Sequence, residues 1–577
     1  MGEPVHQPGD PDRGRPIRDL ADRYVHRFAA LNPLVATWLG LPVGQDRLPD
    51  LSPAGRIAHD ELSRGTLTEL AAAERAAAGA GTLTDIERRC GRLLRERLEA
   101  DLATSGDDEY LRELVNVFGL QERVQEIFAL MPTDGPEDWA AVARRMRRLP
   151  AALADFRETL EQAADRGGFT AAPHQVELLA DQLGQWLAEA GGRGWYAGFT
   201  DAARVSGPLR AELDAAAADA AAGTAGLRDW LRTGYLPRVA GGPDAIGADR
   251  YRVWARFWTG ADPDLVETYE WGWATYRELS AQVERAAGQV LPGATPRAAM
   301  RHLDEHGEAV EGVEAIRVRL QQLMDETIRD LDGTVFELAP PLRVVQARIA
   351  PAGSGAAYYT PPSQDFSRPG RTWLPGNGQT RFPLWQLLST WYHEGVPGHH
   401  LHLGQWVYVA DRLSLYQSSV GGVDACTEGW ALYAERLMDE LGYFADPGDR
   451  LGYLDRQLLR AIRVVLDIGL HLELPAPADS PLGAGRRWTP ELARAFLGAH
   501  SGQPAAALDA EVGRYLGLPG QAISYKLGER AWLAGRAAAE AAHRDRGTEF
   551  DTRSWHMAAL SLGSVGLRDL VDELGHL

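Results

Sequence analysis

The 577-residue sequence has only two cysteines, Cys90 and Cys426, far too few for a framework of disulfide bonds. It has no run of about 18 or more apolar residues, so no transmembrane helix is expected. Basic residues are in the minority, because 60 Lys and Arg oppose 80 Asp and Glu and leave a formal net charge of −20. This excess of negative charge argues against nucleic acid and against an anionic membrane as partners.

The first 16 residues lack the apolar core of a secretory signal peptide. We expect residues 1–16 to form a disordered tail. Without a signal or a membrane-spanning run, the sequence predicts a cytoplasmic protein. It gives no indication of the oligomeric state.

Helical periodicity dominates up to about residue 345, with apolar residues at i, i+3 and i+4. The segments with this pattern are Ile17–Asn32, Leu83–Thr104, Pro136–Arg166, His174–Ala190, Pro263–Val290 and Thr295–Leu331. We therefore predict a helical N-terminal region, 17–338, followed by a second region, 339–577.

Beyond residue 339 the pattern changes. Leu342–Ile349 alternates apolar and polar residues as a strand does, and Ala356–Thr360 and Arg371–Pro375 are short candidate partners. Helical segments return after residue 381. The predicted fold is mainly α, a large multi-helix architecture with a small β-sheet.

The most informative motif is His393-Glu394 followed by His399-His400. Many zinc hydrolases place two imidazoles and a general base around one ion with closely spaced His and Glu residues. The usual spacing, H-E-x-x-H, is broken here because Pro397 occupies the position four residues after His393. A helix with a widened turn can absorb the inserted residues and return a later histidine to the metal side. His399 is the favoured second ligand and His400 its close competitor.

A third ligand is expected downstream, and Glu428 opens an amphipathic helical segment. Two histidines and one glutamate are the ligand set of one class of zinc hydrolase. Asp424 and Glu435 are candidates to orient the ligating histidines or to bind the metal. An ordinary solvated helix charge is the alternative for Glu435.

Several separated blocks resemble the bacterial DUF885 family, whose members look like relatives of the gluzincin metallopeptidases. They are Leu31–Gly40, Ala357–Gly370, His393–His400, Glu428–Glu435 and Pro519–Gly528. The resemblance implies a mostly helical, zinc-dependent hydrolase with peptidase-like machinery, but no particular substrate. It also implies a metallopeptidase-like fold with the small β-sheet next to the metal-binding helix. In this fold the N-terminal region, 17–338, covers the active site, and 339–577 is the catalytic metal-binding half. Phe366 departs from the family pattern, because glycine is expected at this position.

Four further residues are candidates for contact with the substrate. Tyr525 is a candidate to donate its phenolic proton to an oxyanion. The alternative is that Tyr525 is a half-buried packing residue. Tyr359, Arg368 and Lys526 are candidate substrate-binding residues, with surface charge as the alternative for the basic ones.

We therefore predict a hydrolase with one Zn²⁺ per chain, held by His393, His399 and Glu428, in which Glu394 is the general base toward water. The expected substrate is a short peptide or peptide-like amide. Three alternatives remain open: hydrolysis of a non-peptide amide or ester metabolite, another metal-dependent reaction, and a non-catalytic helical binding protein.

Overall fold

The computed structural model describes residues 15–106, 108–112, 114–115, 119–166, 171–350, 356–376 and 378–577. The expected disordered tail lies outside the described residues as far as residue 14, whereas Arg15 is placed and Pro16 begins the first helix. The described chain is mainly helical with short strands, which confirms the predicted fold class. Among the described helices, none combines the length and apolar character needed to cross a membrane.

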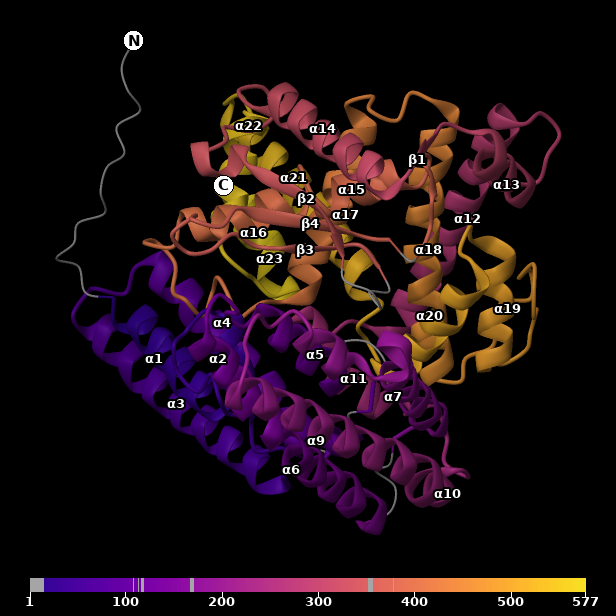
Figure 1. The fold of residues 1–577 in the computed structure, drawn as a ribbon. Coiled ribbons are helices and arrows are strands. Elements are labelled where there is room, and N and C mark those ends of the chain that lie inside the picture. The colour runs from indigo at the N-terminus through magenta and orange to yellow at the C-terminus, as the bar shows by residue number, and fades with distance from the viewer. Residues whose placement is uncertain are drawn as a thin grey trace.

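The N-terminal helices lie together along one side of the molecule, shown in indigo to magenta in Figure 1. They are α1 (Pro16–Leu31), α2 (Pro33–Trp38), α3 (Pro53–Gly79), α4 (Asp85–Gly106), α5 (Leu120–Leu130), α6 (Pro136–Arg166), α7 (Pro173–Gly192), α8 (Trp195–Thr200), α9 (Pro208–Trp230) and α10 (Leu236–Val239). Short 3₁₀ and π segments, η1 (Glu109–Arg112) and η2 (Leu231–Tyr235), join them. Buried residues between Leu114 and Val239 form a hydrophobic core of their own.

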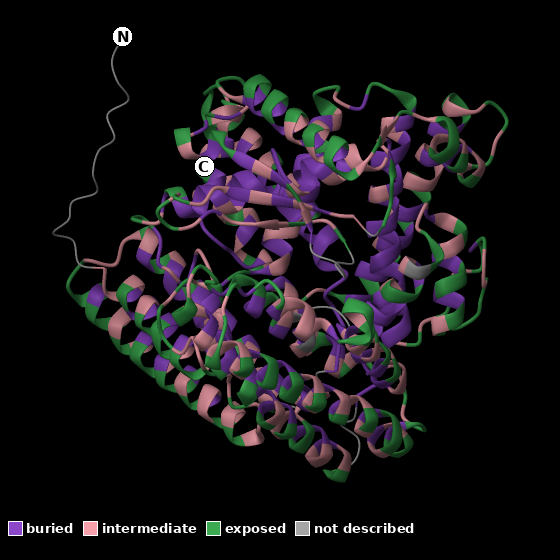
Figure 2. Ribbon diagram, viewed as in Figure 1, coloured by how far each residue is buried: buried purple, intermediate pink, exposed green. Residues whose placement is uncertain are grey.

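The remaining helices share a second, larger core with α1, α3 and α4. They are α11 (Ala248–Thr259), α12 (Leu265–Val290), α13 (Pro296–His306), α14 (Val313–Leu331), α15 (Leu387–Glu394), α16 (His399–Tyr408), α17 (Asp424–Glu440), α18 (Pro447–His471), α19 (Pro490–His500), α20 (Ala505–Gly517), α21 (Ser524–Arg546), α22 (Thr552–Leu560) and α23 (Leu567–Gly575). Figure 2 shows the buried residues concentrated around α15, α17 and α18. This core joins residues from both sides of the predicted division at 338/339, and the division itself stays a prediction.

Two small sheets lie beside these helices. A three-stranded sheet has the order β2 (Val345–Ala350), β4 (Gly370–Pro375), β3 (Tyr358–Thr360), with β4 parallel to β2 and antiparallel to β3. It follows a 3₁₀ turn, η3 (Pro340–Arg343), and β4 contacts α16. The predicted small sheet next to the metal-binding helix is therefore present.

One predicted helix is wrong in its extent. The segment Thr295–Leu331 contains two helices, α13 and α14, separated by the strand β1 (Ala309–Glu311). This strand pairs with β5 (Arg381–Pro383). Gly312 has φ +94, a backbone conformation that other residues rarely adopt, so the helical path cannot continue through it.

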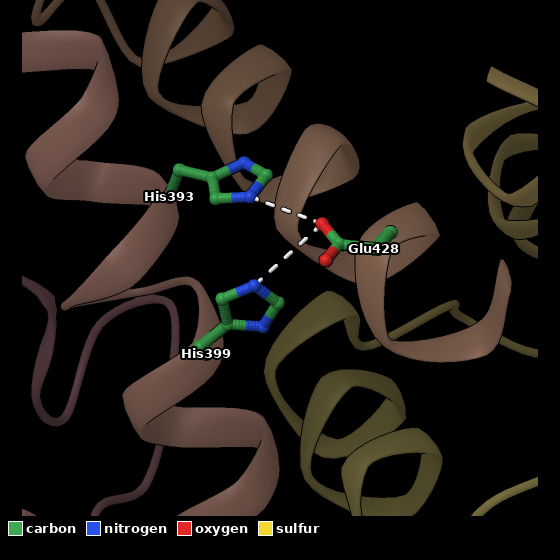
Figure 3. A group of neighbouring side chains, drawn as sticks. All are labelled: His393, His399 and Glu428. Atoms are coloured by element: carbon green, nitrogen blue, oxygen red, sulfur yellow. Dashed lines mark hydrogen bonds and ion pairs between the residues drawn. The ribbon is translucent and has the colours of Figure 1, made fainter. Parts of the chain in front are cut away.

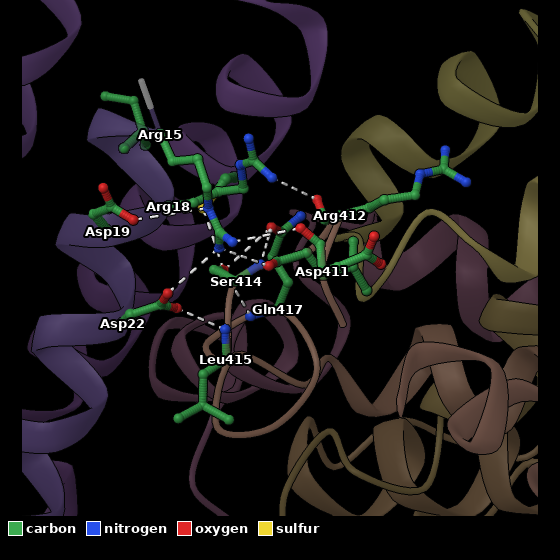
Figure 4. Close-up of polar contacts among 12 residues, drawn as sticks. Arg15, Arg18, Asp19, Asp22, Asp411, Arg412, Ser414, Leu415 and Gln417 are labelled. Atoms are coloured by element: carbon green, nitrogen blue, oxygen red, sulfur yellow. Dashed lines mark hydrogen bonds and ion pairs between the residues drawn. The ribbon is translucent and has the colours of Figure 1, made fainter. Parts of the chain in front are cut away.

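The N-terminal helix α1 holds the loop that follows α16 (Figure 4). Arg18 donates to the carbonyl of Arg412 at 3.0 Å, and the amide of Leu415 donates to Asp22 at 2.6 Å. Arg18 is itself ion-paired with the buried Glu87 of α4. These contacts join the N-terminal helix to the loop that follows the helix carrying His399.

Candidate metal centre

The His393–His400 segment forms two helices joined by a tight turn. Helix α15 ends at Glu394 and α16 begins at His399, with a cis peptide bond between Val396 and Pro397. The Gly398 amide donates to the Tyr392 carbonyl at 2.9 Å, and a Cβ on Gly398 would lie 1.9 Å from the His393 carbonyl oxygen. The predicted single helix with a widened turn is therefore wrong, because this close approach of the backbone ends one helix and starts another.

This turn brings His393 and His399 together with Glu428 of α17 (Figure 3). The Nε2 atoms of His393 and His399 lie 3.2 and 3.7 Å from the same carboxylate oxygen, Oε2 of Glu428. One ligand atom from each of the three residues lies within 4.8 Å of the others. Two imidazole nitrogens and one carboxylate oxygen are a donor set that fits a catalytic zinc ion with an open position.

His400 lies outside this group. Its Nε2 is 2.9 Å from the carbonyl oxygen of Leu342, to which it donates, and its Nδ1 is 2.9 Å from the hydroxyl of Tyr359. A neutral imidazole donates from one nitrogen only, so Nδ1 accepts from Tyr359. Burial lowers the pKa of His400 to about 4, which keeps the ring neutral. Of the two competing histidines, the geometry places His399 and not His400 with His393 and Glu428.

Glu435 orients His393. Its Oε1 lies 2.7 Å from Nδ1 of His393, and its Oε2 accepts from Ser389 at 2.6 Å and from Gln457 at 3.3 Å. Glu435 is fully buried, so the alternative of a solvated helix charge is wrong. With Nδ1–H donated to this carboxylate, Nε2 carries the lone pair that faces Glu428 and the metal position.

The charges of the centre shift its pKa values. Burial lowers the pKa of His393, but hydrogen bonds to Glu428 and Glu435 outweigh it and raise that pKa to about 9. Burial raises the pKa of Glu394, and the two nearby histidines lower it by less, so the net pKa is raised. The half-buried Glu394 makes no hydrogen bond or ion pair with any described residue. Its side chain thus has no hydrogen-bond partner among the described residues, and it lies directly beside the candidate ligand His393 in the sequence.

Asp424 and Tyr525 lie on the other side of the group. Asp424 accepts from Gln521 at 2.8 Å, and burial raises its pKa to about 7; within the described chain no hydrogen bond joins it to a histidine. The Tyr525 ring lies parallel to that of His393, 6.4 Å between centroids. Arg514 donates to the Tyr525 hydroxyl oxygen at 3.0 Å. Gln521 also accepts from Arg514 at 3.0 Å, so Asp424 belongs to the hydrogen-bond network of Tyr525 and not to that of the two histidines.

The predicted substrate-binding residues have different surroundings. Lys526, the only lysine among the 60 basic residues, is buried and donates to Gln457 and Glu529, so it is not a surface charge. Arg368 is half-buried and lies near Tyr359, whose hydroxyl is bound to His400. The substrate roles of these residues stay predictions.

The loop that carries Arg368 also contains Phe366, the departure from the family pattern. Phe366 has φ +55, in the left-handed region that glycine adopts without strain. The loop therefore keeps the backbone conformation of a glycine position although a bulky residue occupies it.

A second group of candidate metal ligands contains His59, Asp60 and Asp101. Arg56 contacts both carboxylates of this group, at 3.0 Å to Asp60 and 3.3 Å to Asp101. Because a guanidinium already supplies the positive charge there, this group is an ion-pair network and not a metal site.

Sequence reasoning missed the supporting residues Ser389 and Gln457 and a row of arginines on α18. The supporting residues have no motif, because they act through contacts between different helices. The arginines did leave a signal, since Arg456, Arg460 and Arg463 recur at i, i+4 and i+7 in the sequence.

Fold and site together define a large α-rich protein with a candidate His-His-Glu metal centre. Residues 33–574 match the family model of bacterial proteins of unknown function (DUF885), and the chain belongs to this family. No curated protein matches the chain by sequence.

Two solved structures share the fold. A protein from Colwellia psychrerythraea, described as a candidate lipoprotein, aligns with TM-score 0.80 and 20% identity over 97% of this chain and 98% of its own. A candidate lipoprotein of unknown function from Shewanella oneidensis aligns with TM-score 0.69 and 19% identity, over 96% and 98% of the two chains. A carboxypeptidase from Pyrococcus furiosus, with TM-score 0.35 and 12% identity over 98% and 96%, is too dissimilar to support an argument. The expected cytoplasmic location is contradicted by the descriptions of the first two proteins and is withdrawn.

Proposed function

We propose that this protein is a zinc-dependent hydrolase that cleaves an amide bond in a short peptide or a peptide-like molecule. The observation that carries the proposal is the convergence of His393, His399 and Glu428, with Glu435 fixing the ring of His393. A zinc ion bound by these three residues would polarise a carbonyl group and make water more acidic. The relation to the gluzincin metallopeptidases is part of this proposal.

Glu394 is the general base. It follows His393 directly, and its carboxylate has no partner among the described residues that would compete for a proton. Its raised pKa brings it closer to neutral pH, where a base can accept a proton from water and return it to the leaving amine.

Tyr525 stabilises the oxyanion. Its hydroxyl oxygen accepts a hydrogen bond from Arg514, which leaves the phenolic proton for another acceptor. The Tyr525 ring stacks on the ring of His393, so Tyr525 lies next to the three candidate metal ligands. A fixed donor at this place stabilises the negative charge that develops on a carbonyl oxygen under attack.

The test measures zinc by elemental analysis in dialysed wild type and in His399→Ala, His400→Ala and Glu428→Ala. We expect about one zinc per chain in wild type and in His400→Ala, and loss of zinc in the other two variants. A peptide library followed by mass spectrometry then detects the cleaved amide bond. Wild-type protein that binds no zinc after reloading would contradict the proposal.

A further inference from the structure

Three arginines occupy one face of α18 beside the metal centre. Arg456, Arg460 and Arg463 follow at i, i+4 and i+7, which places them in one row along the helix. Arg463 is ion-paired with Glu511, with two contacts of 2.6 and 3.0 Å. It is the only one of the three with a bidentate partner among the described residues.

Arg456 has no such partner. Its side chain makes no hydrogen bond or ion pair to any residue in the described part of the chain, and its Nε is buried. The adjacent Asp455 accepts from the Gly502 amide instead. Burial lowers the pKa of Arg456, and the neighbouring charge of Arg460 lowers it further. Arg456 is half-buried, and the charges of Asp455 and Glu435 act in the opposite direction without a hydrogen bond or ion pair to it. Its buried Nε is therefore a donor that no described residue satisfies, which costs free energy in the absence of a ligand.

Arg460 is only partly satisfied. It donates to the Arg456 carbonyl at 3.2 Å and lies 3.8 Å from Glu435, but its buried Nε has no partner in the described structure. Glu435 also bonds to His393, so Arg460 and His393 contact the same carboxylate. Its guanidinium also faces the Tyr525 ring, 6.0 Å from the centroid. The arginine row thus lies beside the metal centre. Arg460, whose Nε has no partner among the described residues, contacts the carboxylate of Glu435.

We propose that Arg456 and Arg460 bind a carboxylate of the substrate, so that the amide bond to be cleaved lies close to a free carboxylate group. This inference rests on the proposed function. A planar guanidinium matches the geometry of a carboxylate and forms short, charge-assisted hydrogen bonds with it. The carboxylate is either the C-terminus of a peptide or an acidic side chain, and the experiment separates the two.

The probes are three peptides: N-acetyl-trialanine with a free C-terminus, the same peptide with a C-terminal amide, and an amidated N-acetyl-Ala-Asp-Ala. Calorimetry measures their binding to Glu394→Gln protein, both loaded with zinc and free of metal, so that cleavage does not interfere. The same titrations follow with Arg456→Gln added. Arg450→Gln is the matched control, because Arg450 lies on α18 and is ion-paired with Asp439.

We expect at least one carboxylate peptide to bind about 30-fold more tightly than the amidated trialanine, since a buried charge pair is lost with the amide. Preference for the free C-terminus identifies a terminal carboxylate, and preference for the aspartate peptide identifies a side chain. Arg456→Gln should remove the preference and Arg450→Gln should keep it. Equal affinity for all three peptides, absent binding included, would overturn the inference, as would a preference that survives Arg456→Gln.

Two further readouts separate this inference from the proposed function. A carboxylate preference in the metal-free protein supports the arginine row even if the wild type binds no zinc, which would overturn only the proposed hydrolase. Without peptide, the Tm of Arg456→Gln should stay close to that of the parent, because the Arg456 side chain makes no hydrogen bond or ion pair in the described structure. A Tm lower by several degrees would show that Arg456 serves the fold and would overturn the inference.

Discussion

The metal centre and the arginine row lie side by side but differ in how their polar groups are satisfied. In the metal centre, the carboxylate of Glu435 receives hydrogen bonds from His393, Ser389 and Gln457. In the arginine row, the buried Nε atoms of Arg456 and Arg460 have no partner among the described residues. Satisfied groups hold a fixed geometry, which a metal site requires, whereas a buried donor without a partner can form a hydrogen bond with a ligand.

Helix α18 contributes to both regions. Gln457 supports Glu435, and its neighbour Arg456 is unpaired. Gln457 also accepts from Lys526, so the supporting network extends across to α21. A helix that is buried over most of its length therefore carries a positioning residue and a candidate substrate-binding residue one position apart, which fixes the distance between the two regions.

The largest expected effect concerns Glu394, the acidic group of the metal centre that has no partner in the described chain. Glu394→Gln should lower turnover by about 10²- to 10⁴-fold, because the amide cannot accept the proton from water. The zinc content should equal that of wild type, since Glu394 is not a ligand. Turnover is measured on a peptide that the wild type cleaves. Activity within a few-fold of wild type would assign the base to another residue.

The next prediction compares the paired arginine with the unpaired one. Glu511→Gln should destabilise the fold by about 3 to 5 kcal/mol, because it leaves Arg463 buried without a counter-charge. Arg456→Gln should cause no loss, as argued above. Urea unfolding measures both, with Asp509→Asn as the control, since Asp509 is exposed on the same helix α20. A loss under 1 kcal/mol for Glu511→Gln would remove the contrast between the two arginines.

The stabilisation of the fold by the Glu511–Arg463 ion pair depends on pH. Burial raises the pKa of Glu511, but Arg463 and Arg514 outweigh it and hold that pKa at about 2, below its ordinary value of 4.5. Its contribution to stability is therefore present above pH 4.5 and is lost as the pH falls toward 2. The difference in unfolding free energy between wild type and Glu511→Gln should shrink over this range. A difference that stays constant from pH 6 to pH 3 would exclude the ion pair as its cause.

A variant of Glu435 tests the metal centre, where the polar groups have hydrogen-bond partners. Glu435→Gln keeps the shape of the side chain but removes the charge that orients His393, and zinc affinity should fall about 10- to 100-fold. Competition with a chelator measures the affinity. Glu440→Gln on the same helix is the control, because Glu440 is exposed and ion-paired with Arg436 and Arg536, away from His393. Equal affinities for the two variants would show that the Glu435 contact does not tune the metal.

The three candidate metal ligands could be predicted from the sequence, because their residue types and spacing are typical of a zinc site. His393, His399 and Glu428 each belong to a recognisable block, and the structure brings them together. The turn between the two histidines could not be predicted, since it depends on the approach of Gly398 to the His393 carbonyl oxygen. Local periodicity does not report such a close backbone contact.

The supporting residues could not be predicted for a different reason. Ser389 and Gln457 meet at Glu435 from separate helices, α15 and α18, and only the packing of the core decides which residues meet. The main helices were predicted because their apolar period of 3.6 residues is strong. Thr295–Leu331 was an exception, since a short strand interrupts two helices whose patterns continue each other.

The smallest expected effect is on zinc affinity and comes from comparing one variant of each region, Ser389→Ala and Arg456→Gln. Ser389→Ala removes one of the hydrogen bonds to Glu435, worth about 1 kcal/mol, and zinc affinity should fall about five-fold. Arg456→Gln should leave zinc affinity unchanged, because Arg456 bonds to no residue of the metal centre in the described structure. The same chelator competition measures both. If Arg456→Gln weakened zinc more than Ser389→Ala did, the two regions would be one coupled network, and the unpaired arginine would have to be counted as part of the metal site.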